Sequence, residues 1–592
     1  MARRSCRCVA VVGGLAVLVG IGWTAVCAAG AEYQTQQERA ASRCVSEALE
    51  SEITGKNSHR DGLLKAALEE APDHPAARWQ SGYVRSGGRW VKFEELPELA
   101  SQDQRLAAYR RMRDKFGDTV EAQLELARWC KRARLPEQSR AHLGHVLQLD
   151  PDHQEARALL GYKWINGTWM TDKDVERART RAAAADAALR QWRPKLVEIR
   201  DGLENRSPKR RQIAQDRLDA IEDSRAVGAV EAVLCQREAT ALAGINKLAE
   251  MPAADASVSL ARQALFSPWP AVRQAAVEKL KTRDRETFVP VLLSLMGSPI
   301  QSRVELYQDP GTGQILYRHI FYREGQDRDQ LAVFDTTYAV DDGTGWVARL
   351  DAAGKARQRE AAAARLNVMT EAASRPICRL LVETTGVNLP EAPDAWSEWW
   401  AETNEVYVPA YKPRSVVYRQ DRQVMVTPSS PLISAPGGPA AHYSCLAAGT
   451  PVWTESGPVA IERIRVGDRV LAQDADSGEL AYKPVLHTTI RQEAPLVRLE
   501  LLDDTITTSS GHPFWIAGQG WMKARDIGPY MNFHGAAGTT PLHGSEPAGT
   551  GRVYNLIVAD FHSYFVGKAV VLSHDITRRK PSDLLVPGLA RR

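Results

Sequence analysis

Hydrophobic side chains recur at helical spacing through much of the first half of the chain. After each of two such stretches comes a Pro-Asp-His tripeptide, and then the pattern Gly-Tyr-x4-Gly-x-Trp, which predicts a short hairpin with glycine at its turn. The proline, glycine and tryptophan are displaced by 79 residues between the two copies, which indicates an internal repeat. The apolar spacing predicts an amphipathic helix before each tripeptide, formed by Leu63, Leu64, Ala67 and Leu68 in one copy and by Leu143, Val146 and Leu147 in the other.

In each copy we expect the proline to end one helix and the aspartate, Asp73 or Asp152, to cap the next. This unit resembles the tetratricopeptide type, although 79 residues is not a multiple of that family's period. Residues 254–297 hold three short helical faces separated by prolines and a charged turn, and they resemble HEAT-type repeats. Such units stack into solenoids that bind protein partners; a plain spacer is the alternative interpretation.

The remaining upstream segments differ from one another in charge pattern and in the secondary structure that they predict. Residues 173–249 intersperse basic and acidic side chains, which is typical of solvated helices rather than of a nucleic-acid surface. Residues 303–340 read as strands broken by a Pro-Gly turn. Helical spacing returns over residues 354–403 and ends in three tryptophans that we expect in core or capping positions, Trp396, Trp399 and Trp400.

The first thirty-one residues have the pattern of a secretory signal peptide. A basic start is followed by an apolar run over 9–29, and Ala29-Gly30-Ala31 offers the small residues that a signal peptidase reads. The alternative is a retained membrane anchor, because the run approaches membrane-spanning length. We therefore expect an exported protein of the periplasm, cell surface or extracellular space, without a transmembrane helix once the signal is cleaved.

The amino-acid composition excludes several classes of protein but does not indicate a specific function. The 592 residues are 44% hydrophobic and 25% charged, which excludes a disordered or collagen-like chain. The net charge of +4 is too small to argue for a nucleic-acid partner. Of eight cysteines, three lie in the signal segment and the other five are scattered without C-x-x-C spacing, so no metal site or cofactor is expected.

The predicted fold class is multidomain: an α-helical repeat solenoid with a small β insertion, followed by an all-β domain. The expected boundaries are a signal peptide (1–31), a TPR-like region with the repeat (32–172), long charged helices (173–250), HEAT-like helices (251–300), a strand-rich segment (301–350), a helical Trp-rich segment (351–426), a Pro- and Gly-rich linker (427–444), the β domain (445–575) and a tail (576–592).

The β domain carries the residues that suggest chemistry. Cys445 directly follows the linker and opens the run Cys-Leu-Ala-Ala-Gly-Thr, after which apolar and polar residues alternate as successive hairpins. His512 follows in His-Pro-Phe-Trp, and His562 lies within Val-Tyr-Asn-Leu-Ile-Val-Ala-Asp-Phe-His-Ser-Tyr-Phe-Val. The pattern closes with His574-Asp575. In this order and spacing the blocks resemble the Hint family, the autoprocessing fold of hedgehog proteins and inteins, and most closely its bacterial pretoxin form.

The resemblance implies roles for named residues. A thiol at the position of Cys445 attacks the carbonyl of the preceding residue, Ser444, and converts the peptide bond into a thioester. His512 matches the histidine that assists this shift, and imidazole titrates near neutral pH. Family members place threonine three residues before that histidine; here the position holds Ser509, with Thr508 beside it. The histidines of the last two blocks correspond to His562 and His574.

Two departures from the family pattern argue against protein splicing. Inteins end in His-Asn followed by Cys, Ser or Thr, whereas this chain reads His574-Asp575-Ile576. Aspartate lacks the amide nitrogen used in asparagine cyclisation, and isoleucine offers no nucleophile. Asn555 also stands where many inteins carry aspartate. The remaining expectation is single-turnover self-cleavage between Ser444 and Cys445, with thioester hydrolysis and release of the helical part. The alternatives are a non-catalytic exported scaffold and transfer of the upstream part to an amine or lipid.

Overall fold

The computed structural model describes residues 36–592 except 166–167, 309–314, 326–327, 339–344, 406–411, 413, 423–444, 580–581, 583 and 591–592. The expected signal peptide, the linker and Ser444 lie outside the described residues. Among the residues that are described, none of the helices combines the length and the apolar character needed to cross a membrane.

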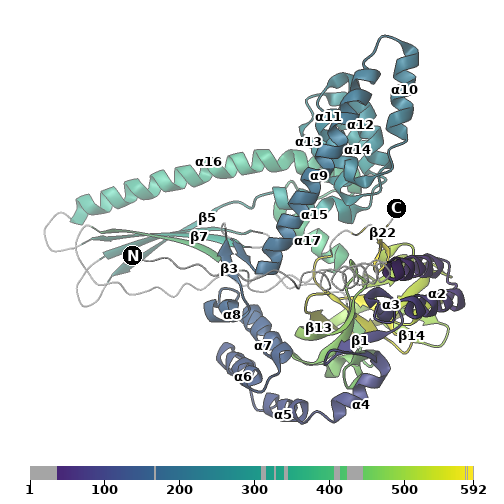
Figure 1. Cartoon of the computed structure of the whole chain (residues 1–592). Coiled ribbons are helices and arrows are strands. Elements are labelled where there is room, and N and C mark those ends of the chain that lie inside the picture. The colour runs from purple at the N-terminus through teal and green to yellow at the C-terminus, as the bar shows by residue number, and fades with distance from the viewer. Residues whose placement is uncertain are drawn as a thin grey trace, which may run out of the picture.

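The repeat region is helical and forms an arc below the C-terminal domain in Figure 1. It begins with a helix over residues 36–53. The following elements are α2 (Asn57–Glu70), α3 (Pro75–Gln80), β1 (Tyr83–Ser86), β2 (Arg89–Lys92), η1 (Phe93–Glu95), α4 (Leu96–Ser101), α5 (Gln104–Arg113), α6 (Val120–Arg132), α7 (Pro136–Leu149), α8 (Gln154–Leu159), β3 (Lys163–Ile165) and β4 (Thr168–Met170).

Both copies of the repeat fold as the spacing predicts, with one correction. Each contains the expected hairpin, β1–β2 in the first and β3–β4 in the second. The helix caps, however, are the histidines of Pro-Asp-His rather than the aspartates. His74 Nδ1 accepts from the amide of Ala77, and His153 Nδ1 accepts from the amide of Ala156. The cap falls on the histidine because a proline or glutamine one residue later is already the first helical residue.

A second helical bundle stands above the repeat region in Figure 1. Its buried side chains form one hydrophobic cluster that includes Trp396 and Trp400, which are 0% and 6% exposed, as expected for core positions. The bundle comprises α9 (Asp172–Leu203), α10 (Pro208–Asp219), η2 (Ser224–Ala226), α11 (Val227–Val233), α12 (Glu238–Glu250), α13 (Ala254–Phe266), α14 (Pro270–Leu280), η3 (Arg285–Thr287), α15 (Val289–Leu295) and α17 (Pro393–Asn404).

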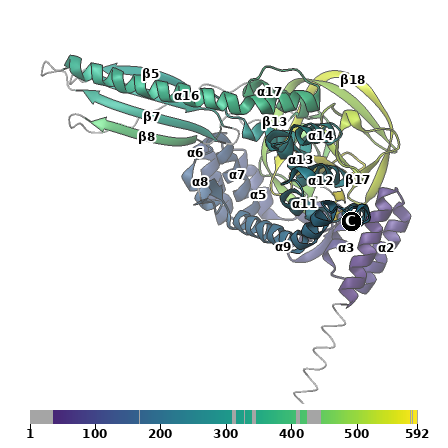
Figure 2. The same ribbon diagram turned by 90° about the horizontal axis from the view of Figure 1, so that it is seen from above.

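A four-stranded sheet and one long helix project from the bundle as an arm (Figures 1 and 2). Strands β5 (Gln301–Gln308), β6 (Ile315–Arg323) and β7 (Asp329–Tyr338) are antiparallel, and β8 (Arg414–Arg422) adds to β7 in parallel. The helix is α16 (Gly345–Thr385). The first three strands match the predicted strand-rich segment. Strand β8 lies inside the segment expected to be helical, so that part of the prediction was wrong. The sequence does not reveal this strand because it is short and its partner β7 lies far away along the chain.

The C-terminal domain is a twelve-stranded sheet, predominantly antiparallel, that curves on itself. Two long strands with several bulges, β13 and β18, pair along most of their length and bend the sheet. The strands are β9 (Leu446–Ala447), β10 (Pro451–Thr454), β11 (Gly457–Ala460), β12 (Arg469–Gln473), β13 (Leu480–Leu501), β14 (Thr505–Ser509), β15 (Pro513–Ile516), β16 (Gly520–Lys523), β17 (Asn532–Gly535), β18 (Gly538–Val558), β19 (Ser563–Val566) and β20 (Val571–His574), with turns η4 (Ile461–Arg463) and η5 (Ala524–Asp526).

The segment expected to be a tail contains a further hairpin. Strands β21 (Leu584–Val586) and β22 (Leu589–Ala590) pair with each other, and Val586 is fully buried. Val586 belongs to the same hydrophobic cluster as Leu49 and Leu64 of the N-terminal helices. The end of the chain is therefore part of the folded core rather than a solvated extension.

Candidate functional site

Cys445 lies at the start of β9, a two-residue strand held between β14 and β18. Cys445 is fully buried, and hydrogen bonds with the two hydroxyl residues that end β14, Thr508 and Ser509, hold its backbone. Its carbonyl oxygen accepts from the Ser509 amide at 2.8 Å and from Thr508 Oγ1 at 2.9 Å. Its own amide donates to Ser509 Oγ at 3.0 Å. The nitrogen of the predicted scissile bond is thus held by the hydroxyl that replaces the family threonine.

An acidic residue from the upstream bundle enters this site. Ser509 Oγ donates to Glu405 Oε2 at 2.7 Å, and Glu405 is 7% exposed. Glu405 ends α17 in the left-handed conformation, with φ of 50°. Glu405 packs against the backbone of Gly511, where an added Cβ would lie 2.6 Å from the carboxyl carbon and would displace the carboxyl group. Burial raises the pKa of the Glu405 carboxyl, with the hydrogen bond from Ser509 and the charge of Arg491 opposing the shift.

The thiol itself sits in apolar surroundings. Cys445 packs with Ala494, Val553 and Leu496. Burial, followed by the nearby Glu405 carboxylate, raises the pKa of the Cys445 thiol well above its usual value. The resting form is therefore the protonated thiol, which is a weaker nucleophile than the thiolate.

His512 occupies the turn between β14 and β15, three residues after Ser509. Its backbone closes that turn by donating to the Ser509 carbonyl at 3.1 Å. The ring is fully buried, with Nε2 2.7 Å from Ser573 Oγ, while Nδ1 has no hydrogen-bond partner among the described residues. Burial lowers the pKa of His512 to about 3, so the imidazole is neutral near neutral pH. When Ser573 donates to Nε2, the ring proton resides on Nδ1 and is available to a further acceptor.

The other two predicted histidines gather around Asp575. Its carboxylate accepts from His562 Nδ1 at 3.1 Å and from the Val558 amide at 3.1 Å. A third donor is the Thr577 amide, at 2.8 Å. His574 Nδ1 lies 2.6 Å from the Asp575 carbonyl. Although burial opposes ionisation, the hydrogen bond and charge of His562 hold the pKa of Asp575 below its usual value. The site thus has two parts, one around Cys445 and one around Asp575.

Three residues of the site were not singled out from the sequence. Ser573 joins the two parts, because it contacts His512 and immediately precedes His574. Tyr564 is fully buried and donates to Asn555 Oδ1 at 2.7 Å. Both lie in the block patterns, so their positions were visible in the sequence although their contacts were not. Glu405 lies 104 residues from its partner Ser509, and no local pattern marks it.

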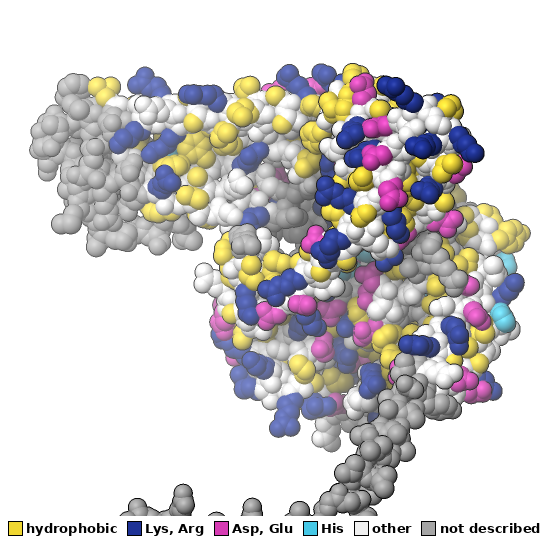
Figure 3. All heavy atoms as spheres, turned by 45° about the horizontal axis from the view of Figure 1, so that its top comes forward, with side chains coloured by type: hydrophobic (Ala, Val, Ile, Leu, Met, Phe, Trp, Pro, Cys, Tyr) yellow, Lys and Arg dark blue, Asp and Glu magenta, His cyan; other side chains and the backbone are white. Residues whose placement is uncertain are grey.

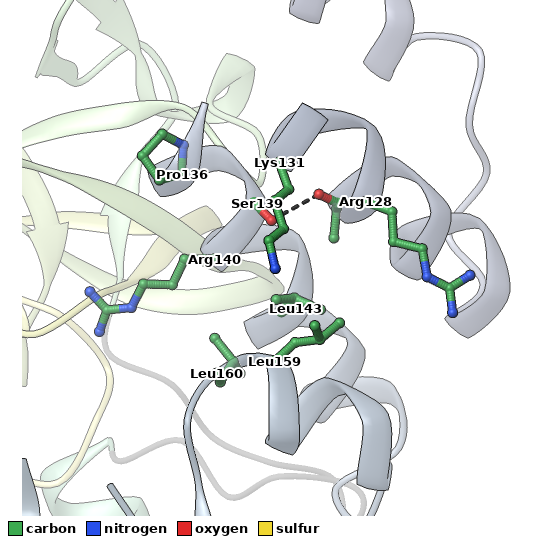
Figure 4. A pocket seen from close by; sticks show the side chains of 9 residues that line it. Arg128, Lys131, Pro136, Ser139, Arg140, Leu143, Leu159 and Leu160 are labelled. Atoms are coloured by element: carbon green, nitrogen blue, oxygen red, sulfur yellow. Dashed lines mark hydrogen bonds between the residues drawn. The ribbon is translucent and has the colours of Figure 1, made fainter. Parts of the chain in front are cut away.

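A cavity of about 270 Å³ lies in the repeat region, away from this site. It is lined by residues of α6, α7 and α8 (Figure 4). Ser139 donates to the Ala127 carbonyl at its wall, and the Arg140 side chain points out of it toward the C-terminal domain. Cys445 is not among its lining residues.

The comparisons with known proteins bear on the C-terminal domain alone. Among solved structures, a bacterial intein-like domain from Clostridium thermocellum is 32% identical, with a TM-score of 0.22, and the match covers 22% of this chain and 98% of that one. The gp41-1 intein is 22% identical with a TM-score of 0.20, over 22% and 98% of the two chains. A DnaB intein from Synechocystis is 14% identical with a TM-score of 0.21, also over 22% and 98%. A comparison with curated proteins finds no match.

The class of the domain follows from its sheet and from a matching family model. A curved β fold that opens on a cysteine, with a hydroxyl residue and a histidine in the turn beside it, is a domain of the Hint class, which is of autoprocessing type. Within that class, the family model of the pretoxin Hint domain matches residues 452–576. The helical architecture upstream agrees with the expected repeats.

Proposed function

We propose that the Hint domain cleaves its own chain between Ser444 and Cys445. In the first step the Cys445 sulfur bonds to the Ser444 carbonyl carbon and the bond from that carbon to the Cys445 nitrogen breaks. The proton lost by the thiol is balanced by the one gained at nitrogen, so the products are a thioester and an amine. In the second step water attacks the thioester, the carbon–sulfur bond breaks, and Ser444 becomes a carboxylate while the thiol is regenerated.

The observation that carries this proposal is the hydrogen bond from the Cys445 amide nitrogen to Ser509 Oγ. An amide nitrogen leaves only when it is protonated, so a positioned hydroxyl and an available acid belong beside it. The hydrogen bond from that nitrogen to Ser509 Oγ supplies the first. We assign the second to His512 acting as a proton carrier: its neutral imidazole can accept the thiol proton and, once protonated, pass it to the departing nitrogen, and its buried Nδ1 has no partner among the described residues. Thr508 and the Ser509 amide hold the Cys445 carbonyl and so fix the residue that bears the thiol.

Cleavage after Asp575 is not part of the proposal. The Asp575 carboxylate has no amide nitrogen to attack its own carbonyl, and it is held by hydrogen bonds from His562 and two backbone amides. The next residue, Ile576, is 1% exposed, and the chain continues into a hairpin that packs in the core. These features argue against splicing, and N-terminal cleavage alone is expected.

The experiment is expression of residues 32–592 followed by gel analysis and mass spectrometry. The expected products are a fragment ending at Ser444 and one beginning at Cys445, and Cys445→Ala abolishes both. Cys378→Ala is the matched control, because that thiol is equally buried but packs against Met296 in the helical bundle. A wild-type chain that stays intact, with and without added hydroxylamine or thiol, overturns the proposal. The exact mass at the Ser444 end separates hydrolysis from transfer to an amine or lipid.

A second candidate function is a non-catalytic scaffold with a degenerate Hint domain. Complete burial of Cys445 and its raised thiol pKa favour this reading. The arm supports the related proposal of a protein partner, because hydrophobic side chains lie open along it among lysines and arginines (Figure 3). Those exposed by about half include Val304, Val416 and Val417. In both functions we propose that the chain is exported through its N-terminal signal segment.

A further inference from the structure

The chain upstream of the proposed cut shares hydrophobic cores with the Hint domain. One cluster of buried side chains combines Val84, Phe93 and Leu96 from the first repeat with Hint residues Leu471, Leu480, Tyr482, Trp515, Ala536, Phe565 and Leu572. The Phe93 ring meets the Trp453 ring edge to face at 5.4 Å, and Tyr482 donates to the Phe93 carbonyl at 3.0 Å. Figures 1 and 2 both show α2 and α3 lying against the β domain.

A second shared core lies at the end of the chain. The helix over residues 36–53, α2 and α3 enclose Val586 of the terminal hairpin together with Ala517 of the Hint domain. Gln80 Nε2 donates to the Pro587 carbonyl at 3.0 Å. The Gly518 amide donates to the Leu585 carbonyl at 2.8 Å, which ties the hairpin to the Hint sheet. The hairpin is thus packed between the two parts that cleavage would separate.

Buried charges also cross between the two parts. Glu52, which is fully buried, accepts from Arg60 Nε at 2.8 Å and pairs with His534 of the Hint domain. The second nitrogen of His534 lies 2.6 Å from Gln473 Oε1. Although burial opposes ionisation, the charges and hydrogen bonds of His534 and Arg60 hold the pKa of Glu52 below its usual value. Separation would leave this carboxylate without one of its partners.

Two further contact regions extend the interface around the Hint domain. Arg113 of α5 pairs with Asp468 at 2.8 Å, and Arg140 of α7 pairs with Asp560 at 2.8 Å. On the side of the helical bundle, Glu286 pairs with Arg579. Glu405, at the end of α17, completes the interface inside the catalytic site itself. The upstream chain therefore contacts the Hint domain on several sides through three separate segments.

We propose that cleavage does not release the upstream part: the two fragments remain one non-covalent complex. This inference rests on the proposed self-cleavage, because only a cleaved chain has two fragments. The interface itself is present in the uncut chain, so it can be tested whether or not self-cleavage occurs. Shared hydrophobic cores are typical of permanent interfaces, whereas separable partners meet through more polar surfaces. Under this proposal the helical part stays bound instead of being released, and the Hint domain with the terminal hairpin is a lasting subunit.

The test inserts a recognition sequence for a site-specific endoprotease between residues 430 and 440 of the chain that also carries Cys445→Ala. After digestion, both fragments are expected to elute together at the position of the uncut protein in size-exclusion chromatography at micromolar concentration. They are expected to separate only in denaturant. Fragments that elute separately from a fully digested, folded sample overturn the proposal. Because the protease makes the cut, an inactive Cys445 has no effect on this result.

A matched pair of substitutions locates the interaction. Phe93→Asp places a charge in the shared core, and we expect it to move at least half of the digested sample from the joint peak to separate peaks. Leu366→Asp is the control, because Leu366 is 50% exposed on α16 in the arm. The uncut Phe93→Asp chain is examined by circular dichroism to verify that both parts stay folded. Equal co-elution of the two digested variants overturns the assignment of this core as the holding surface.

Discussion

Replacing Ser509 by alanine should slow self-cleavage by about 5-fold, which corresponds to about 1 kcal/mol of activation free energy. The Ser509 hydroxyl accepts from the Cys445 amide at 3.0 Å and donates to Glu405 at 2.7 Å, and it is fully buried. A hydrogen bond to a carboxylate contributes about 1.5–3 kcal/mol and a neutral one about 1 kcal/mol. Only the bond to the Cys445 nitrogen acts on the breaking bond, so the rate effect is smaller than the total loss of about 3 kcal/mol, which appears in folding stability.

The assay follows a pulse-labelled chain through a chase, with samples separated by gel electrophoresis and fitted to a single exponential. Ser509→Thr restores a hydroxyl at the position where family members carry threonine, and it should recover most of the rate. Ser510→Ala removes the neighbouring hydroxyl as a matched control and should cleave at the wild-type rate. If Ser509→Ala cleaves as fast as the wild-type chain, the role given to the Ser509 hydroxyl is refuted. A loss shared by Ser510→Ala would indicate a general structural effect.

Three further predictions concern charge in the site. Glu405→Gln removes the carboxylate beside the thiol, so the pH–rate profile of cleavage should move to lower pH; an unmoved profile would contradict this. Asp575→Asn sets an amide nitrogen against a backbone donor at Val558 or Thr577, and urea unfolding should show a loss of about 1–3 kcal/mol. Burial lowers the pKa of His512 to about 3 and of His574 to about 4. Both are neutral when folded but titrate near 6.5 when unfolded, so stability is complete above pH 6.5 and falls below it, by about 1.4 kcal/mol per histidine at pH 5.5. Urea midpoints that do not fall between pH 7 and 5 would contradict the last prediction.

Local patterns in the sequence predicted the elements that depend on near neighbours. The repeat hairpins followed from glycine and tryptophan spacing. The resemblance to the Hint blocks pointed to Thr508 and Ser509 as site residues, and the structure places both in contact with Cys445. The histidine caps were missed because aspartate and histidine are adjacent in Pro-Asp-His and only the backbone decides which one precedes the first helical residue.

Contacts between distant segments could not be predicted in this way. Glu405 reaches Ser509 across 104 residues, and Val586 meets Leu49 across most of the chain. In the sequence, neither Glu405 nor Val586 stands in a periodic pattern that would mark it as a contact residue. A single sequence without its fold shows that Val586 is apolar, but it does not show what covers it. Segments that composition assigns to separate regions therefore contribute side chains to shared cores.

The two copies of the 79-residue repeat have diverged at the positions that decide what each one touches. Val84, 1% exposed beneath the Hint domain, corresponds to Lys163, and the buried Phe93 corresponds to Asp172, whose carboxylate binds that lysine at 2.7 Å. The second copy instead faces the arm, where the Arg328 guanidinium lies 5.0 Å from the ring centroid of Trp164, the counterpart of Arg85. A duplicated module has thus become two different adaptors. What each copy contacts depends on a few side chains at corresponding positions, while the helices and the hairpin are common to both copies.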